Sequence, residues 1–156
     1  MNEMPIIQVL IAQIEADDII SYVTQMEHYN GWQKIIVSND KDFMQLCDDE
    51  TVLWRPTVNE MLNANRIVEK IGVHPRNMAL ARAMAGDASD NLPGIKGAGL
   101  KTISKRFSFM GEETDYLLED ILECCNGVEK PLLIHKRILN NVDLIKKNYS
   151  LMQLYS

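Results

Sequence analysis

The apolar positions in the first part of the chain fall in short blocks that alternate between strand and helix character. Residues 6–12 form a short, β-branched apolar run, which predicts a buried strand. Apolar residues then recur at helical spacing over 15–29, and the Asn-Gly pair that follows predicts the end of that helix. A second apolar run over 34–38 predicts another buried strand, followed by a polar loop that caps a short helix over 39–46.

After one more strand the pattern becomes helical. Residues 51–54 predict the third strand, and the helix predicted over 63–71 ends at Gly72. The remaining apolar spacing predicts helices over 77–85, 114–125, 132–140 and 142–154. Strands that alternate with helices predict an α/β fold with a parallel sheet as its core. We expect one compact unit with an α/β part over 1–75 and a helical part over 76–156.

Acidic side chains gather after two of the predicted strands and again in a later turn. Lys41 is the only base inside these groups. Ligands collect at the carboxyl ends of parallel strands, and a dense group of carboxylates is costly unless cations neutralise it. Oxygen ligands select hard ions, so we expect a two-metal site for Mg²⁺ or Mn²⁺. The candidate catalytic and metal-binding residues are Glu15, Asp17, Asp18, Asp40, Asp42, Asp87 and Asp90.

Each acidic group also has a purely structural interpretation. Acids in the first turn of a helix stabilise it by about 0.3 to 1 kcal/mol each. Asp40 and Asp42 could cap a turn, and residues 86–91 could form another capped turn. Taken together, the groups favour metal-assisted phosphodiester hydrolysis, which needs no covalent nucleophile. The sequence contains no G-x-S-x-G motif and no thiolate zinc spacing.

The charge distribution changes how the net charge of -6 is interpreted. Residues 96–110 carry four bases and no acid, and residues 86–99 hold four of the eight glycines. Glycines let backbone N–H groups approach a phosphate, and bases add charge without reading sequence. The pattern predicts a helix-hairpin-helix element that grips a DNA backbone. Its candidate DNA-binding residues are Gly94, Ile95, Lys96, Gly97, Gly99, Lys101, Thr102 and Lys105.

The sequence shows no sign of a membrane or secretory segment. No apolar run approaches the roughly 18 to 20 residues that span a bilayer. The start lacks the basic and apolar regions of a signal peptide. We therefore expect a soluble intracellular protein with no membrane partner.

Three motifs in register resemble the 5′-nuclease family, which includes bacteriophage 5′→3′ exonucleases, flap endonucleases and the N-terminal nuclease domain of bacterial DNA polymerase I. They are EADD over 15–18, SNDKDFMQL over 38–46 and GDASDNLPGIKGAGLKT over 86–102. The resemblance extends over roughly residues 5–145. It implies a PIN-like fold and a Mg²⁺-dependent exonuclease or flap endonuclease. Its substrates would be DNA flaps, nicks or RNA primers in replication and repair.

The resemblance also implies a role for each group of residues. Glu15, Asp17 and Asp18 would face the first metal and the space between the two metals. The second metal would be held by Asp40, Asp42, Asp87 and Asp90. The hairpin over 94–99 would bind the duplex backbone, with K⁺ coordinated by hairpin carbonyls, and Lys101 and Lys105 would extend that contact.

One departure from the family pattern concerns the N-terminal side. Family members begin with a strand that carries an Asp, followed by a second Asp and a helical arch rich in Lys and Arg. These features have no counterpart before the strand predicted over 6–12. We therefore expect that the N-terminal part is supplied by a separate nuclease polypeptide, or that the chain is a fragment of a longer protein. The expected nucleic-acid partners are flapped, nicked or branched DNA and RNA–DNA hybrids. A catalytically silent duplex-binding module, and a domain whose acids are all caps, remain as alternatives.

Overall fold

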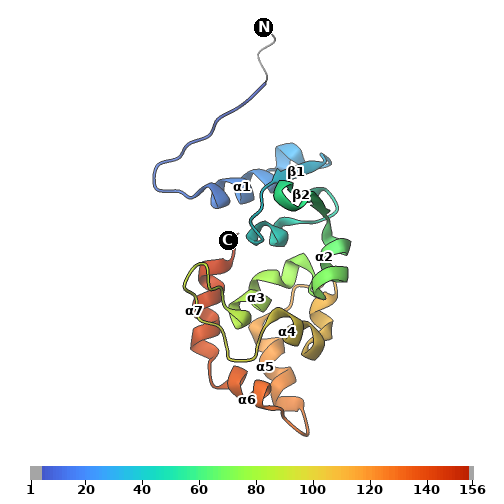
Figure 1. Ribbon diagram of the computed structural model, residues 1–156, viewed down its shortest axis with the longest axis vertical. Helices are drawn as coiled ribbons and strands as arrows, with labels where there is room; N and C mark the ends of the chain where they lie inside the picture. The colour runs from blue at the N-terminus through green and yellow to red at the C-terminus, as the bar shows by residue number, and fades with distance from the viewer. Residues whose placement is uncertain (1–4, 155–156) are drawn as a thin grey trace.

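The computed structural model describes residues 5–154 and has a small sheet on one side of a group of helices (Figure 1). The α/β part contains α1 (Ala16–Thr24), β1 (Lys34–Val37), β2 (Thr51–Arg55), β3 (Glu60–Leu62) and α2 (Ala64–Ile71). The helical part contains α3 (Pro75–Ala85), α4 (Leu100–Arg106), α5 (Leu118–Gly127), α6 (Leu133–Leu139) and α7 (Val142–Met152). Short 3-10 helices connect them: η1 (Glu27–Tyr29), η2 (Asp42–Leu46), η3 (Pro56–Val58) and η4 (Ser108–Gly111). The expected α/β class is confirmed.

The sheet has three strands in the order β1-β2-β3. β1 and β2 are parallel, with Ile36 opposite Leu53, as the sequence predicts. β3 is antiparallel to β2, with Leu62 opposite Leu53, and the sequence pattern does not reveal it. The strand has only three residues and follows a turn in which Asn59 adopts a left-handed conformation. A strand this short carries almost no periodic signal.

The prediction of a strand over 6–12 is wrong. These residues have no regular secondary structure, and Leu10 is 92% exposed. Figure 1 shows the segment leaving the body of the protein. A strand persists only when a neighbour pairs its N–H and C=O groups, and no described strand pairs with this segment. Apolar composition alone does not supply that neighbour.

Helix α3 lies at the centre of a hydrophobic core that joins the two parts of the chain. Nine of its eleven residues are buried, and it packs against η2 on one side and α7 on the other. The same core contains Leu53 from the sheet and Ile145 from α7. A charged residue in the buried part of such a helix must lie inside the protein. Arg82, which is 7% exposed, is such a residue.

Tertiary contacts shift the ends of several predicted helices. α5 begins at Leu118 instead of at residue 114, because Asn77 of α3 binds the preceding segment as a loop. Its Nδ2 donates to the carbonyls of Met110 and Thr114, at 3.0 and 2.9 Å, and its Oδ1 accepts from the backbone N–H of Tyr116. In the first part, α1 ends at Thr24 instead of continuing to residue 29. No helix within the described range is both long and apolar enough to cross a membrane.

Candidate functional site

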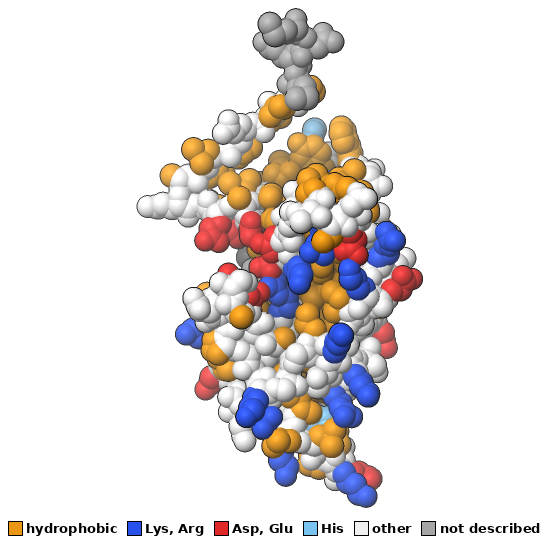
Figure 2. Space-filling model, viewed as in Figure 1, with side chains coloured by type: hydrophobic (Ala, Val, Ile, Leu, Met, Phe, Trp, Pro, Cys, Tyr) orange, Lys and Arg blue, Asp and Glu red, His pale blue; other side chains and the backbone are white. Residues whose placement is uncertain are grey.

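The structure brings acidic residues from three separate segments toward one hollow. Figure 2 shows Asp and Glu side chains beside this hollow, below α1. One group lies at the start of α1, the second follows β1 and enters η2, and the third lies in the loop after α3. Asp17, Asp42 and Asp87 are partly buried, whereas the other four acids are exposed: Glu15, Asp18, Asp40 and Asp90.

The pKa of Asp17 reports how close these segments are. Burial raises this pKa above its usual value, and the negative charges of Asp40, Glu15, Asp18 and Asp90 raise it further. Asp40 and Asp90 belong to the other two groups, so the carboxylates repel one another across the hollow. Acids that serve only as local caps have no reason to share one electrostatic environment.

Asp18 also borders a second hollow. It lines a hollow of about 520 Å³ between α1 and the end of α7, together with Ser150 and Gln153. Its side chain therefore borders α7 as well as the other acids of its own group.

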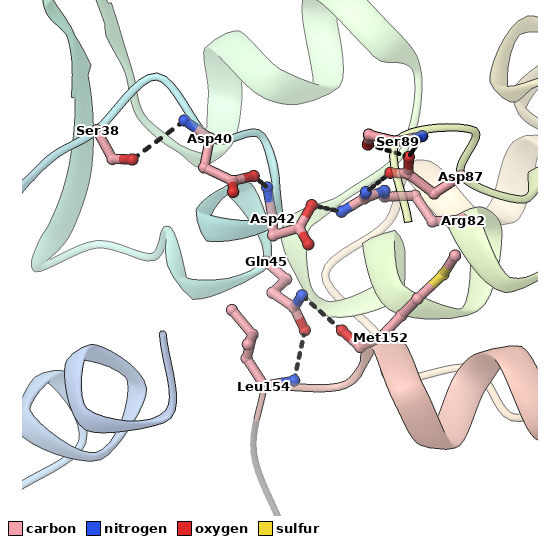
Figure 3. Close-up of polar contacts among 9 residues, drawn as sticks. All are labelled: Ser38, Asp40, Asp42, Gln45, Arg82, Asp87, Ser89, Met152 and Leu154. Carbon is pink, nitrogen blue, oxygen red and sulfur yellow. Dashed lines mark hydrogen bonds and ion pairs between the residues drawn. The ribbon is translucent and has the colours of Figure 1, made fainter. Parts of the chain in front are cut away.

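A buried base, Arg82, joins two of the acidic groups (Figure 3). Its guanidinium donates to the carboxylate of Asp42 in η2 and to that of Asp87 in the following loop. Arg82 was not among the predicted site residues, because it lies outside the acidic groups in the sequence. The available signal was an Arg in the middle of the Ala- and Met-rich helix predicted over 77–85, since a buried Arg requires acidic partners.

The two carboxylates that share Arg82 differ in pKa. Burial raises the pKa of Asp42 despite the opposing effect of Arg82, and the charges of Asp40 and Asp87 also raise it. The pKa of Asp87 is lowered to about 2, first by the Ser89 hydroxyl, then by the Ser89 backbone N–H and by Arg82. Asp87 is therefore a firmly ionised group, whereas Asp17 and Asp42 hold their charge less readily.

Asp40 also has a local structural role, as the capping interpretation expected. Its backbone N–H donates to Ser38 Oγ at 3.1 Å, and its Oδ1 accepts from the backbone N–H of Asp42 at 2.9 Å. These bonds fix the turn between β1 and η2 (Figure 3). The turn bond uses only Oδ1 of Asp40, so one carboxylate can serve both roles.

The loop that carries Asp87 and Asp90 is closed by backbone contacts. Asp87 and Leu92 exchange two backbone hydrogen bonds of 2.8 Å. Gly94 packs so closely that a Cβ there would lie 1.8 Å from the Ala85 carbonyl oxygen. Asn148 of α7 donates to the carbonyls of Ala83 and Pro93, at 3.0 and 2.9 Å. The glycine and the asparagine together hold this loop in a defined position.

The end of α7 braces the other two acidic segments as well. Gln45 of η2 donates to the Met152 carbonyl at 3.0 Å and accepts from the Leu154 backbone N–H at 3.1 Å. Ser21 of α1 donates to the Leu154 carbonyl. All three acid-bearing segments are thus bonded to α7 or to Leu154 just after it, although no residue of this region was predicted at the site.

The glycine hairpin lies between α3 and α4, as predicted. The Ile95 backbone N–H donates to the Met84 carbonyl at 2.9 Å, which fixes the hairpin to α3. Six of the predicted DNA-binding residues are exposed: Gly94, Lys96, Gly97, Gly99, Lys101 and Lys105. Thr102 is partly buried. Ile95 differs from expectation, because its side chain is 6% exposed and packs in the core, which leaves only its backbone for a ligand.

The oxygen donors of the acidic groups fit divalent cations. The acidic side chains are nevertheless spaced too widely to form a complete metal site. The side chains supply only oxygen donors, and their mutual repulsion would be relieved by a cation. Across residues 5–154, no three Asp, Glu, His or Cys side chains are close enough together to hold one ion. Arg82 instead neutralises part of the charge of Asp42 and Asp87.

Comparisons with known proteins agree with these features. A family model described as the 5′-3′ exonuclease N-terminal resolvase-like domain matches residues 1–72. A 5′-3′ exonuclease of Buchnera aphidicola is 34% identical over 96% of this chain and 49% of its own length. The thermostable DNA polymerase I of Thermus aquaticus is 33% identical over 90% of this chain and 16% of its own length. The chain thus spans half or less of the curated relatives it matches.

Solved structures show the same fold. The T5 5′-exonuclease with bound divalent zinc ions has a TM-score of 0.73 and 20% identity, over 90% of this chain and 50% of that protein. A T5 flap endonuclease in complex with DNA and metal ions has a TM-score of 0.72 and 19% identity, with the same coverage.

Proposed function

This chain is a relative of the 5′-3′ exonucleases over nearly all of its length, and we propose that it forms part of a metal-dependent, structure-specific 5′-nuclease. Its reaction would be hydrolysis of phosphodiester bonds in DNA flaps, nicks or RNA primers during replication and repair. Such substrates place it in the cytoplasm of a bacterium or a phage-infected host. The observation that carries the proposal is the convergence of three acidic segments next to a glycine hairpin.

The acids would hold two Mg²⁺ or Mn²⁺ ions. Asp40, Asp42, Asp87 and Asp90 are proposed for one ion, and Glu15, Asp17 and Asp18 for the other and for the space between them. Bound divalent cations supply Lewis-acid activation of water and of the scissile phosphate. Arg82 holds Asp42 and Asp87 in place, and Ser89 keeps Asp87 ionised.

The two parts of the chain would contribute different residues to metal binding and to duplex binding. Residues 1–75 supply the first two acidic groups, and residues 76–156 supply the hairpin together with Asp87 and Asp90. Helix α3 leads into the acidic loop at Gly86, and Met84 near its end binds the hairpin. A rigid element between the two sites would hold a duplex at a constant distance from the carboxylates.

The unpaired edge of β1 favours the proposal that a second polypeptide is a partner. Within the described residues β1 pairs only with β2, so its other edge is open. Ile35 and Val37 on this strand are 56% and 66% exposed. Together with residues of α1 they line an apolar hollow of about 530 Å³. A partner that adds a strand to β1 would cover this surface and satisfy its unpaired backbone groups.

The alternative, a silent module that only holds duplex DNA, is less favoured. Arg82 pairs with two of the seven acids, and within residues 5–154 the other five form no ion pair with a base. A module without metals would have to tolerate the repulsion that raises the pKa of Asp17.

Cleavage of a 5′-labelled flap duplex in Mg²⁺ tests the proposal. The protein would be assayed with EDTA, with Asp40→Asn, which keeps an oxygen for the turn, and with Asp49→Asn as an exposed acid outside the groups. We expect metal-dependent cleavage that Asp40→Asn abolishes and Asp49→Asn leaves unchanged. Duplex and Mn²⁺ binding without cleavage would indicate that the partner is required. If the protein neither cleaves the duplex nor binds Mn²⁺, the proposal is rejected.

A further inference from the structure

A guanidinium from a distant helix lies against the glycine hairpin. Arg137 of α6 donates from Nη1 to the carbonyl oxygen of Lys96 at 2.8 Å. The two residues are 41 positions apart in the sequence, so the contact is tertiary. A Cβ at Gly97 would lie 3.5 Å from the same nitrogen. The positive charge of Arg137 is therefore in contact with the turn that is expected to meet a phosphate backbone.

Arg137 is held in this position by its own helix. Ile134 and Ile138 on either side of it are buried in the core. Asn141 donates from Nδ2 to the Arg137 carbonyl at 2.7 Å, which ties down the end of α6. The backbone from which the Arg137 side chain extends is therefore fixed relative to the core.

Three of the six carbonyls of the hairpin over 94–99 already have donors within the chain. The Ile95 carbonyl accepts from the Ala98 backbone N–H at 2.9 Å, and the Lys96 carbonyl accepts from Arg137. The Gly99 carbonyl accepts from the backbone N–H groups of Thr102 and Ile103. K⁺ needs several carbonyl oxygens directed at one point, and a guanidinium beside them repels it. The residues of this hairpin therefore do not fit the K⁺ ion that the family resemblance implies.

From these contacts we infer that Arg137 is an internal cation that takes the place of K⁺ at the hairpin. The hairpin is then stable, and binds duplex DNA, without any requirement for K⁺. The second half of this inference rests on the proposed function, because it concerns the duplex that the hairpin would hold. The first half concerns only the folded chain and can be tested without DNA.

Thermal unfolding in KCl and in tetramethylammonium chloride at equal ionic strength tests the first half. Tetramethylammonium is too large to occupy a carbonyl site. We expect the same Tm in both salts for the unaltered protein and for Arg137→Lys, which keeps a cation. Arg137→Met should have a lower Tm in tetramethylammonium and recover part of the loss in KCl. Lys136→Met removes a neighbouring exposed charge without this contact and should show no salt-specific change.

Fluorescence anisotropy with a nicked duplex, in the same two salts, tests the second half. For Arg137→Met we expect Kd in tetramethylammonium to rise about tenfold, because the hairpin is then less ordered before it binds, and K⁺ to reverse part of that rise. The inference is overturned if the unaltered protein loses stability or affinity when K⁺ is replaced, or if Arg137→Met behaves like Lys136→Met. A salt-independent Tm with no duplex binding in either salt would leave Arg137 as the internal cation and reject the proposed function.

Discussion

The Arg82 guanidinium donates to the Asp42 carboxylate, and this contact joins α3 to η2 across 40 residues of sequence. Both side chains are largely shielded from water, with 9% and 21% of their surfaces exposed. The same guanidinium reaches Asp87, so a single base connects the two acidic groups proposed to hold one metal. The relative position of these carboxylates is therefore set before any cation binds.

Replacing Arg82 should destabilise the protein more than replacing an exposed base. Arg82→Met leaves two carboxylates without their buried partner, a change that typically costs about 3 to 5 kcal/mol. Urea unfolding should show this loss, and Mg²⁺ should recover part of it because it can neutralise the same acids. Arg66→Met, an exposed residue of α2, serves as the control. A loss no larger than that of the control would contradict the role assigned to Arg82.

Gly94 should not tolerate a side chain. Gly94→Ala places a Cβ 1.8 Å from the Ala85 carbonyl oxygen, so the backbone of the acidic loop has to move. We expect a loss of about 2 kcal/mol or more in the free energy of unfolding. Gly127→Ala, at the end of α5, has no atom within 4 Å of the new Cβ and should be neutral or stabilising. Equal effects of the two substitutions would refute the close packing at Gly94.

The contribution of Asp87 to stability should depend on pH. Its pKa of about 2 in the folded protein lies below the ordinary value of 3.8, so the ionised form is favoured by folding. This stabilisation is complete above about pH 4 and is lost as the pH falls toward 2. Asp87→Asn should therefore be less stable than the unaltered protein at pH 7, and the difference should shrink in acid. Ser89→Ala should reduce the effect, because the Ser89 hydroxyl makes the largest contribution to the shift. If the stability difference between Asp87→Asn and the unaltered protein does not change with pH, the lowered pKa of Asp87 is contradicted.

The bases of α4 should set the salt dependence of duplex binding. Lys101 and Lys105 are exposed beside the hairpin. If each contacts a phosphate, its replacement by Met should reduce the slope of log K against log salt by about 0.9. Affinity should fall equally for duplexes of different sequence, because phosphate contacts do not read bases. Lys130→Met, an exposed base outside the hairpin and α4, is the matched control. An unchanged slope for both α4 variants would place the duplex elsewhere.

Local chemistry explains what the sequence could predict. The acidic groups, the glycine turn over 86–99 and the helices α3, α6 and α7 are signalled by neighbouring residues, through capping, backbone freedom and apolar spacing. The parallel pairing of β1 and β2 was likewise expected from alternating strands and helices. These features depend on residues close together in the chain.

The sequence by itself therefore determined the α/β class, the family resemblance and the residue types of the candidate site. Only the tertiary structure decided that residues 6–12 form no strand, that Arg82 enters the acidic groups and that Ile95 is buried. It also decided that α7 and Leu154 just after it bind all three acidic segments and that Arg137 contacts the hairpin. The physical reason is that strand pairing, burial and ion pairing depend on partners distant in sequence, and no local pattern encodes which partner a residue will meet.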